Sequence, residues 1–324
     1  MIKEKSSVQQ IAERMKSAKK VAIFTHQRPD GDALGCSLAL SLALDFLNIE
    51  NEIFDESPIP SNLKFLPDLE RVKNKMTEEY DLYIALDCAD LSRLGAFSVA
   101  FEKAGRKFLN TINIDHHISN PSYARYNYVR TCAANCLNVA LLIDALGVPF
   151  TKQIAEYLLT GLLTDSGNFS HDDVTEECLL LSARLVGAGA DIRALNYELF
   201  KKQPKARAKL YGEVMSKIRY FHEDQFAVIV ITLEAMERIG ADNGMTEGFV
   251  DFPLNVDSVE VAASIMEVKK GQYKISLRSK TYADVNKIAG VYGGGGHVRA
   301  SGCMLFGDIE EVLDKLSYTV YQYL

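Results

Sequence analysis

The sequence of 324 residues lacks the long apolar run that a membrane-spanning helix needs. Such a helix requires roughly 18 to 20 successive apolar residues, and the most apolar stretch, ALGCSLALSLALDFL, is broken at Asp45. The N-terminal segment MIKEKSSVQQIAERMKSAKK lacks the apolar core and small-residue cleavage site of a signal peptide. We therefore expect a cytoplasmic protein in which the apolar stretch forms a buried helix.

The six cysteines lack the paired CxxC spacing of zinc sites and redox motifs. Most of them lie in apolar stretches, so we interpret them as reduced thiols of the core. The chain also lacks an excess of positive charge, since its formal net charge is -7. A protein that holds long nucleic acid neutralises many phosphates with Lys and Arg. The charge therefore disfavours a long duplex partner, and a nucleotide partner should be short and bound locally.

Apolar residues make up 48% of the chain and charged residues 24%, a balance typical of globular proteins. A length of 324 residues favours two domains. Up to about residue 185, short β-type stretches alternate with helical patterns, which indicates an α/β domain with a parallel sheet and helices on both faces. The strands are expected at 21–26, 51–54, 81–87 and 108–116, and the helices at 32–47, 132–146 and 152–163.

The second half of the chain has a different pattern. Residues 174–215 read as consecutive helices, and we expect a helical connector at 186–215 between a first domain at 1–185 and a second at 216–324. Two hairpin patterns at 217–231 and 259–279 are followed by a helix, a glycine cluster and a final helix. This order predicts a smaller α+β domain.

Polar residues gather where the first strand ends and the first helix begins. His26, Asp30 and Asp32 lie within seven residues there and offer three metal ligands. In open α/β sheets, ligands bind outside the carboxyl ends of the strands. The alternative is a turn in which Asp32 caps the helix, and for Asp32 taken alone this alternative is favoured.

Three further groups follow apolar elements. Asp87 ends a strand, and its two oxygens could serve two cations. Asp115, His116 and His117 end another strand, where adjacent histidines project in different directions, so one can bind metal while the other reaches substrate. Asp165 ends an apolar helix and could complete the set. Nitrogen and oxygen ligands without thiolate favour Mn²⁺, with Mg²⁺ or Co²⁺ as substitutes.

The second domain contains the run GGGGHVRASG at 293–302. Glycines let backbone N–H groups approach an anion, and His297 adds a side-chain donor. A glycine run alone is most often a flexible turn. Because Arg278 and Ser279 end a nearby β-type stretch, a phosphate or carboxylate pocket is the better interpretation.

The order His-x3-Asp-x-Asp, Asp, Asp-His-His, Asp and GGGH-x2-ASG resembles the DHH phosphoesterase superfamily, and the second domain resembles its DHH-associated domain. Within the superfamily, the two-domain layout is similar to the bacterial nanoRNases and phosphatases of 3′-phosphoadenosine 5′-phosphate (pAp). The resemblance implies a metal-dependent phosphoesterase that hydrolyses short oligoribonucleotides and pAp through water activated by two metal ions.

The resemblance also implies roles for individual residues. One ion would be held by His26, Asp30 and Asp87, and the other by Asp32, Asp87, His116 and Asp165. The implied catalytic residues are Asp87 as the bridge, His116, and His117, which would contact the scissile phosphate. The remainder of the nucleotide would be held by Arg278, Ser279, Gly295, Gly296 and His297.

Four other functions are compatible with parts of this pattern. A cyclic-dinucleotide or pApA phosphodiesterase would be a stand-alone version of larger membrane-bound relatives. A manganese pyrophosphatase shares the first four motifs but not GGGGHVRASG. An RNA-end binding module without activity is disfavoured by the complete ligand set and the negative charge. A Rossmann-type cofactor binder needs a glycine motif after the first strand, where only Gly31 and Gly35 occur. The preferred substrate, the cleavage polarity, the native metal and whether the chain forms a homodimer stay open.

Overall fold

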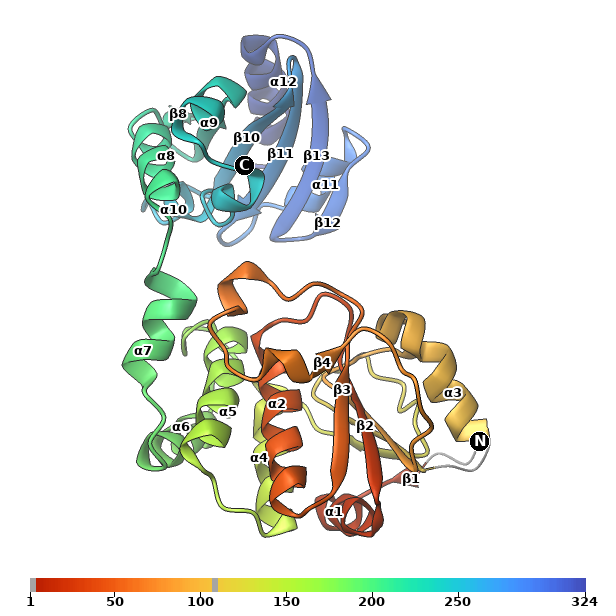
Figure 1. Ribbon diagram of the computed structural model, residues 1–324. Helices are drawn as coiled ribbons and strands as arrows, with labels where there is room; N and C mark the ends of the chain where they lie inside the picture. The colour runs from red at the N-terminus through yellow and green to blue at the C-terminus, as the bar shows by residue number, and fades with distance from the viewer. Residues whose placement is uncertain (1–3, 107–109) are drawn as a thin grey trace. The chain divides into compact units, whose positions relative to one another are not determined.

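The computed structural model describes residues 4–106 and 110–324, and the chain divides into two compact units, Met1–Lys202 and Gln203–Leu324 (Figure 1). The division lies inside the stretch expected to be a connector. None of the helices in the described ranges has the length and apolar character that a bilayer crossing requires.

The first unit is built on a parallel sheet, seven-stranded over the described residues, with the order β1-β7-β6-β5-β2-β3-β4. Its strands are β1 (Glu4–Lys5), β2 (Lys20–Phe24), β3 (Glu50–Phe54), β4 (Val72–Lys73), β5 (Leu82–Leu86), β6 (Asn110–Asp115) and β7 (Tyr126–Val129). The strand expected at 108–116 begins outside the described residues at positions 108 and 109.

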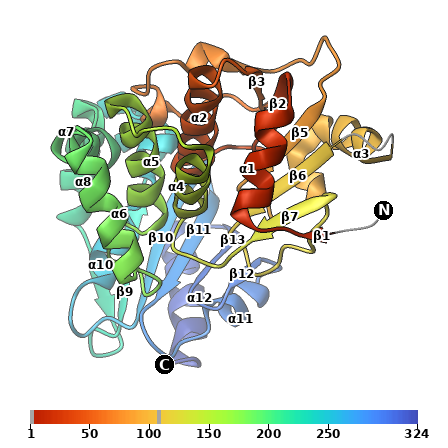
Figure 2. The same cartoon turned by 90° about the horizontal axis from the view of Figure 1, so that it is seen from below.

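Both faces of this sheet are covered, as the apolar composition of its strands requires. On β2, Val21 and Ile23 belong to one buried cluster, while Ala22 and Phe24 belong to another. The first cluster includes residues of several helices, among them α1 (Val8–Ser17) and α4 (Asn135–Leu146). The second lies beneath α3 (Ser98–Arg106), which Figure 2 shows on the other side of the strands from α1 and α4. The alternation of side chains along each strand therefore builds two cores.

The helices of the first unit are α1 (Val8–Ser17), α2 (Gly31–Phe46), α3, α4 (Asn135–Leu146), α5 (Lys152–Asp165), α6 (Glu176–Gly187) and α7 (Ile192–Asn196), with 3₁₀ turns at Ser61–Leu63, Leu69–Arg71 and Leu91–Phe97 and a π-helical turn at Tyr197–Lys201. Helix α2 is buried on nearly all sides, which fits its almost continuous Leu and Ala composition. It is the buried helix expected from the longest apolar stretch.

Two glycines bring the backbones of α2 and α5 together. A Cβ atom added to Gly161 on α5 would lie 2.6 Å from Asp32 Oδ1 and 2.9 Å from Asp32 Cα, and one added to Gly35 on α2 would press on the Tyr157 carbonyl and lie 3.2 Å from the Gly161 nitrogen. Only glycine allows this approach. The crossing fixes the start of α2 against the last turns of α5.

The second unit holds a mixed sheet with the order β12-β13-β11-β10-β9-β8. Its strands are β8 (Arg219–Phe221), β9 (Phe226–Ile231), β10 (Val261–Lys269), β11 (Gln272–Ser279), β12 (Gly295–His297) and β13 (Ala300–Phe306). Its helices are α8 (Lys205–Met215), α9 (Leu233–Ile239), α10 (Asp251–Leu254), α11 (Val285–Gly290) and α12 (Ile309–Tyr321), with a 3₁₀ turn at Asn243–Thr246. Helices α11 and α12 pack on one face, while α8, α9 and α10 pack on β9 and β10 of the other.

The predicted fold class is confirmed: a parallel α/β unit is followed by helices and a smaller α+β unit. Both predicted hairpins are present as antiparallel pairs, β8 with β9 and β10 with β11. Strands β1, β4 and β7 were not predicted, because two of them have only two residues and β7 lies in a polar stretch after the two histidines.

The α2–α5 crossing yields a stability prediction. Gly161→Ala should lower the free energy of unfolding by about 1–3 kcal/mol, because the added methyl group overpacks the contact with Asp32. Urea unfolding followed by circular dichroism measures the change. Gly187→Ala on α6 is the matched control, since a Cβ there meets nothing within 4 Å, and it should be neutral or stabilise by up to about 1 kcal/mol. Equal effects of the two substitutions would contradict the close crossing.

Candidate functional site

The polar residues of the first unit meet at the carboxyl edge of its parallel sheet. His26 follows β2, Asp87 follows β5, and His116 follows β6, and these three strands are neighbours in the order β6-β5-β2. Asp165 is the last residue of α5, which crosses α2 near Asp32. Four segments that are distant in the sequence thus deliver one cluster.

The cap of α2 corrects the sequence-based interpretation of Asp32. Asp30, not Asp32, is the N-cap, and its Oδ1 accepts hydrogen bonds from the backbone nitrogens of Asp32 at 3.1 Å and Ala33 at 3.0 Å. Asp32 lies inside the first turn and is fully buried. The alternative of Asp32 as a cap is therefore wrong, and its carboxylate is directed elsewhere.

His26 is oriented by the backbone. Its Nδ1 lies 2.9 Å from the carbonyl oxygen of Gln27, and since a carbonyl oxygen only accepts, Nδ1 carries the proton and Nε2 presents its lone pair. Nε2 lies 3.5 Å from Asp30 Oδ2 and 3.7 Å from Asp87 Oδ2. One ligand atom from each of these three residues lies within 4.8 Å of the others. Asp30 thus caps the helix with one oxygen and turns the other to the cluster.

His116 is oriented in the same way. Its Nδ1 lies 2.8 Å from the carbonyl oxygen of Cys132, and its Nε2 lies 3.2 Å from Asp87 Oδ1 and 3.6 Å from Asp165 Oδ2. Ligand atoms of Asp32, His116 and Asp165 form a second group within 4.8 Å. Asp87 therefore lies between two histidines, with one oxygen toward each.

The burial and contacts of Asp87 show whether the cluster fits a metal ion. It is 1% exposed, and among the described residues its Oδ1 accepts no hydrogen bond. An unpaired buried carboxylate oxygen is costly unless a cation or donor compensates it. Two atoms bound to one ion at about 2.1 Å lie about 3 Å apart, close to the 3.2 Å between His116 Nε2 and Asp87 Oδ1. The donor set fits divalent cations.

The electrostatics of the cluster also require positive charge. Burial, followed by the charge of Asp87, raises the pKa of Asp32. Burial and the charges of Asp32 and Asp87 raise the pKa of Asp165. Burial lowers the pKa of His116, but the neighbouring Asp87 carboxylate, whose Oδ1 lies 3.2 Å from Nε2, outweighs burial and raises this pKa. Protons partly compensate the converging carboxylates, and divalent ions can replace them.

His117 lies beside these two ligand groups, with its Nδ1 3.8 Å from Asp87 Oδ1. Its Nδ1 lies 2.8 Å from Asp115 Oδ1, and its side chain is 33% exposed. Burial opposes ionisation of Asp115, but hydrogen bonds from His117 and Asn120 lower its pKa. Asp115 thus acts as a fixed anion that orients the His117 ring, and Nε2 has no hydrogen-bond partner among the residues that the structure describes. Asp115 also belongs to a group of potential ligands with Asp87, His116 and His117.

Sequence reasoning missed three residues around the cluster. Asn120 Nδ2 lies 2.6 Å from Asp115 Oδ2 and 2.9 Å from Asn113 Oδ1, and it holds the loop after β6. Its only signal was a polar residue before Pro121. Cys36 and Cys136 are buried as expected, yet their sulfurs lie 3.4 Å apart, and Cys36 Sγ lies 3.4 Å from Asp32 Oδ1. The two thiols therefore lie beside the buried carboxylate of Asp32.

The second unit brings together some of its predicted residues. Arg278 on β11 lies opposite Ala300 on β13, which lies opposite His297 on β12. Residues directly opposite one another share a face of the sheet, so Arg278 and His297 lie in one exposed row. Ser279 faces the other side, is 6% exposed, and has its Oγ 3.4 Å from Arg299 Nη1. The structure does not bring Ser279 to the row.

The two predicted glycines differ in the freedom of their backbone groups. Gly296 has a φ of 152°, and its N–H donates to Asn286 Oδ1 at 2.8 Å. Gly295 lies opposite Gly302 and lines a groove of about 640 Å³ together with Arg278 and Ala300. The glycine run therefore forms a strand edge beside a groove, rather than a loop with several free N–H groups.

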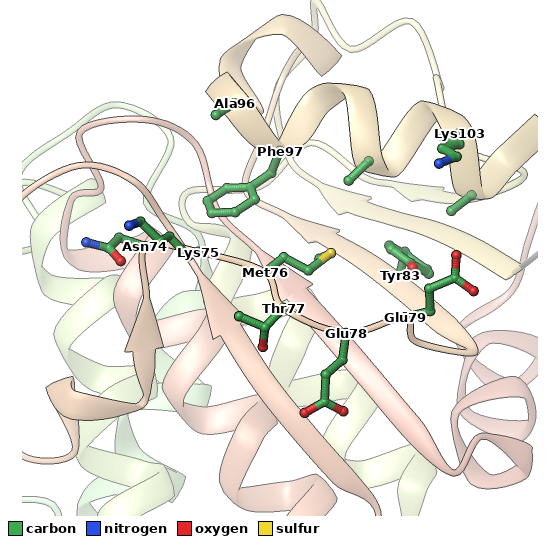
Figure 3. A pocket seen from close by; sticks show the side chains of 12 residues that line it. Asn74, Lys75, Met76, Thr77, Glu78, Glu79, Tyr83, Ala96, Phe97 and Lys103 are labelled. Atoms are coloured by element: carbon green, nitrogen blue, oxygen red, sulfur yellow. The ribbon is translucent and has the colours of Figure 1, made fainter.

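A separate pocket of about 650 Å³ lies on the α3 face of the first sheet (Figure 3). Phe97 and Met76 approach each other across it, with Tyr83 nearby. None of the potential metal ligands that cluster in the described ranges lines this pocket. The chemistry belongs to the carboxyl edge of the sheet.

Two family models match the chain. Residues 20–162 match the model described as the DHH family, N-terminal domain, and residues 224–324 match the DHHA1 domain. The first match contains His26, Asp87 and His116, and the second contains Arg278 and His297.

Curated relatives and a solved structure agree with these matches. The "Bifunctional oligoribonuclease and PAP phosphatase NrnA" of Thermus thermophilus is 34% identical over 97% of this chain and 93% of its own length. The "Probable bifunctional oligoribonuclease and PAP phosphatase NrnA" of Streptococcus mutans is 26% identical over 90% of this chain and 91% of its own. The crystal structure of an exopolyphosphatase-related protein from Bacteroides fragilis is similar to this chain, with a TM-score of 0.82 and 26% sequence identity. The match covers 98% of this chain and 96% of that protein's chain.

Asp165 allows a test of the cluster as a cation site. Its pKa in the folded chain is raised from 3.8 to about 10, so the folded metal-free protein holds a proton there that the unfolded chain releases. Its stability should therefore fall as the pH rises from about 4 towards 10. Asp165→Asn should remove this part of the pH dependence, because the amide stays neutral at every pH.

The same variant should lose metal-linked stability. In the parent chain, Mn²⁺ at 100 times its dissociation constant should add about 2.7 kcal/mol, and the gain in Asp165→Asn should be clearly smaller. Urea unfolding in EDTA and in Mn²⁺, at pH 5.5 and 8.5, measures both effects. A variant with the parent's pH slope and the parent's gain would contradict the role of Asp165.

Proposed function

The chain belongs to the DHH family of phosphoesterases, and from this premise we propose that it hydrolyses short oligoribonucleotides and pAp with the help of two divalent metal ions. One observation carries the proposal: the buried Asp87 places one oxygen toward His26 and the other toward His116, and its Oδ1 has no hydrogen-bond partner in the described ranges. Such a carboxylate is suited to serve two cations at once. The similarity to relatives named oligoribonuclease and PAP phosphatase supports the substrate class.

We assign the ligands in two sets that share Asp87. His26 and Asp30 belong with its Oδ2, and Asp32, His116 and Asp165 belong with its Oδ1. Nitrogen and carboxylate donors favour Mn²⁺, with Mg²⁺ or Co²⁺ as substitutes. When bound, two such ions would stabilise negative charge on the phosphoryl oxygens and lower the pKa of the attacking water.

The protein's own groups prepare the site for this chemistry. The backbone carbonyls of Gln27 and Cys132 hold the two histidine ligands with Nε2 toward the carboxylates. Asp115 holds His117 through Nδ1, which leaves Nε2 to bind a phosphoryl oxygen and to hold a proton there. Because each ring is fixed by a hydrogen bond, little reorganisation is needed when the substrate arrives.

We propose that the two units have different roles in the reaction. The first contains the reacting groups, and the second binds the part of the nucleotide that does not react. Arg278 is the guanidinium best placed for this binding, because it lies 36% exposed in the row that includes His297. A planar guanidinium suits a phosphate because it can donate two parallel hydrogen bonds.

The function is tested by a product assay with Mn²⁺ on pAp, pApA, a labelled short RNA and pyrophosphate, each repeated in EDTA. We expect release of phosphate from pAp and of mononucleotides from short RNA, both lost in EDTA. Cleavage of pyrophosphate alone, or of pApA but neither pAp nor RNA, would contradict the proposed substrate class.

The role of Asp87 is tested in the same assay. Asp87→Ala should lower kcat by at least about 10³-fold, since it removes a group that both ions need. Asp172→Ala is the matched control, because Asp172 is an exposed carboxylate that follows α5 and belongs to none of the ligand clusters in the described ranges. Circular dichroism verifies that both variants fold. Substantial hydrolysis by a folded Asp87→Ala protein would refute the two-metal assignment.

A further inference from the structure

The sheet of the second unit is covered unequally on its two faces. Helices α11 and α12 pack against the buried side chains of β10, β11 and β13 on one face. On the other face, α8, α9 and α10 cover residues of β9 and β10. The strands β11, β13 and β12 continue beyond these helices (Figure 1). Residues of these strands line a groove of about 640 Å³. The groove lies wholly within the second unit.

Alternate residues of β11 face this groove. Ile275 and Leu277 point into the core, so Lys274, Ser276 and Arg278 point outward. Residues two apart on a strand are about 6.6–6.8 Å from each other along it. A cation, a hydroxyl and a second cation therefore follow one another at a regular interval along one wall of the groove.

The neighbouring strands β13 and β12 form the bottom of the groove and have glycines there. Ser276 lies opposite Gly302 on β13, and Gly302 lies opposite Gly295 on β12. In this row across the three strands, the small Ser276 side chain is followed by two glycines, so the middle of the groove between the two cations is shallowly filled. At the Lys274 end, the opposite residue is Met304, which is half-buried and offers an apolar, polarisable surface.

The two cations differ in their partners. Arg278 Nε lies 3.7 Å from Asp251 Oδ1, at the edge of α10. The side chain of Lys274 is exposed and forms no hydrogen bond or ion pair within the described ranges. The Lys274 end of the groove thus presents a positive charge that no carboxylate in this part of the chain neutralises.

We propose that this groove is a track for single-stranded RNA in which Lys274 binds a second phosphate, beyond the one assigned to Arg278 and His297, and Met304 contacts a base. The interval of about 6.6–6.8 Å between alternate residues of β11 is close to the distance between adjacent phosphates of an extended strand. Lys274 and Arg278 lie two such intervals apart, so their ammonium and guanidinium groups match phosphates two nucleotides apart. Grooves that bind single strands combine such cations with surfaces on which bases lie. This inference rests on the proposed function and names residues that set its preference for substrate length.

The consequence is a dependence on length. A strand of five nucleotides can contact Lys274 and Arg278 together, whereas pAp, with a single nucleoside, cannot span both. Lys274→Gln should weaken binding of pentaadenylate about three- to fivefold, the usual effect of one exposed charge contact. The ratio of the dissociation constants for pentaadenylate and pAp should rise by the same factor.

The experiment measures binding by the whole chain in EDTA, where hydrolysis is prevented, with fluorescently labelled pentaadenylate as the probe and pAp as competitor. Titrations at several salt concentrations give the slope of log K against log salt. Each phosphate contact to a single strand contributes about 0.7 to this slope. Lys274→Gln should therefore reduce it by about 0.7, and Lys274→Arg should restore it.

A matched control removes the same charge elsewhere. Lys315 is an exposed lysine on α12, which packs on the opposite face of the sheet. Lys315→Gln should leave both the affinity and the salt slope for pentaadenylate unchanged. A purely structural effect of Lys274→Gln would appear as a lower free energy of unfolding, with no change in the salt slope.

The outcomes separate this inference from the proposed function. Binding with the predicted salt slope but no hydrolysis in Mn²⁺ would support the track and refute the activity. Hydrolysis of pentaadenylate with Lys274→Gln equal to the parent in affinity and slope would refute the track alone. Absence of any binding to pentaadenylate would also refute the track.

Discussion

The structure depends on four carboxylates and two imidazoles that converge at one edge of a parallel sheet. Burial raises the pKa of Asp32 and of Asp165, and Asp87 keeps one oxygen without a hydrogen-bond partner among the described residues. Such an arrangement is unfavourable without a cation. Apolar surroundings raise the cost of the converging negative charge further, and this excess of negative charge favours divalent cations at the cluster.

Several parts of the first unit serve this convergence. The glycine contact between α2 and α5 sets Asp32 near Asp165. Asp87 has a φ of 53°, a left-handed conformation that costs free energy for a residue other than glycine. It turns the chain sharply at the end of β5, so that the side chain reaches between the two histidines. Stability is thus given up at a functional position, where such strain is commonly found.

The fold class and the main elements could be predicted from the sequence, because buried strands and helices leave regular apolar patterns. The positions of His26, Asp87 and His116 could be predicted too, since each follows an apolar strand and parallel strands end at a common edge. The helix start at Asp30 was misassigned, because two aspartates two residues apart are equally good caps by composition. Backbone geometry alone distinguishes them.

Other features depend on contacts between distant segments, and no local pattern encodes them. Asn120 reaches back to Asp115, and Cys36 meets Cys136 across 100 positions. Ser279 turned out to face the core side of its sheet, which follows from the register of β11 and not from its place beside Arg278. Short strands such as β1 acquire their structure from pairing, so their sequences carry little signal.

The central claim is that Asp87 joins two metal ions in one site, and the most direct measurement is electron paramagnetic resonance of the protein titrated with Mn²⁺. Two ions that share a carboxylate at about 3.5–4 Å are magnetically coupled. The account predicts two Mn²⁺ per chain with a coupled spectrum, which Asp87→Ala abolishes. A single ion per chain, or two ions with independent spectra, would contradict it.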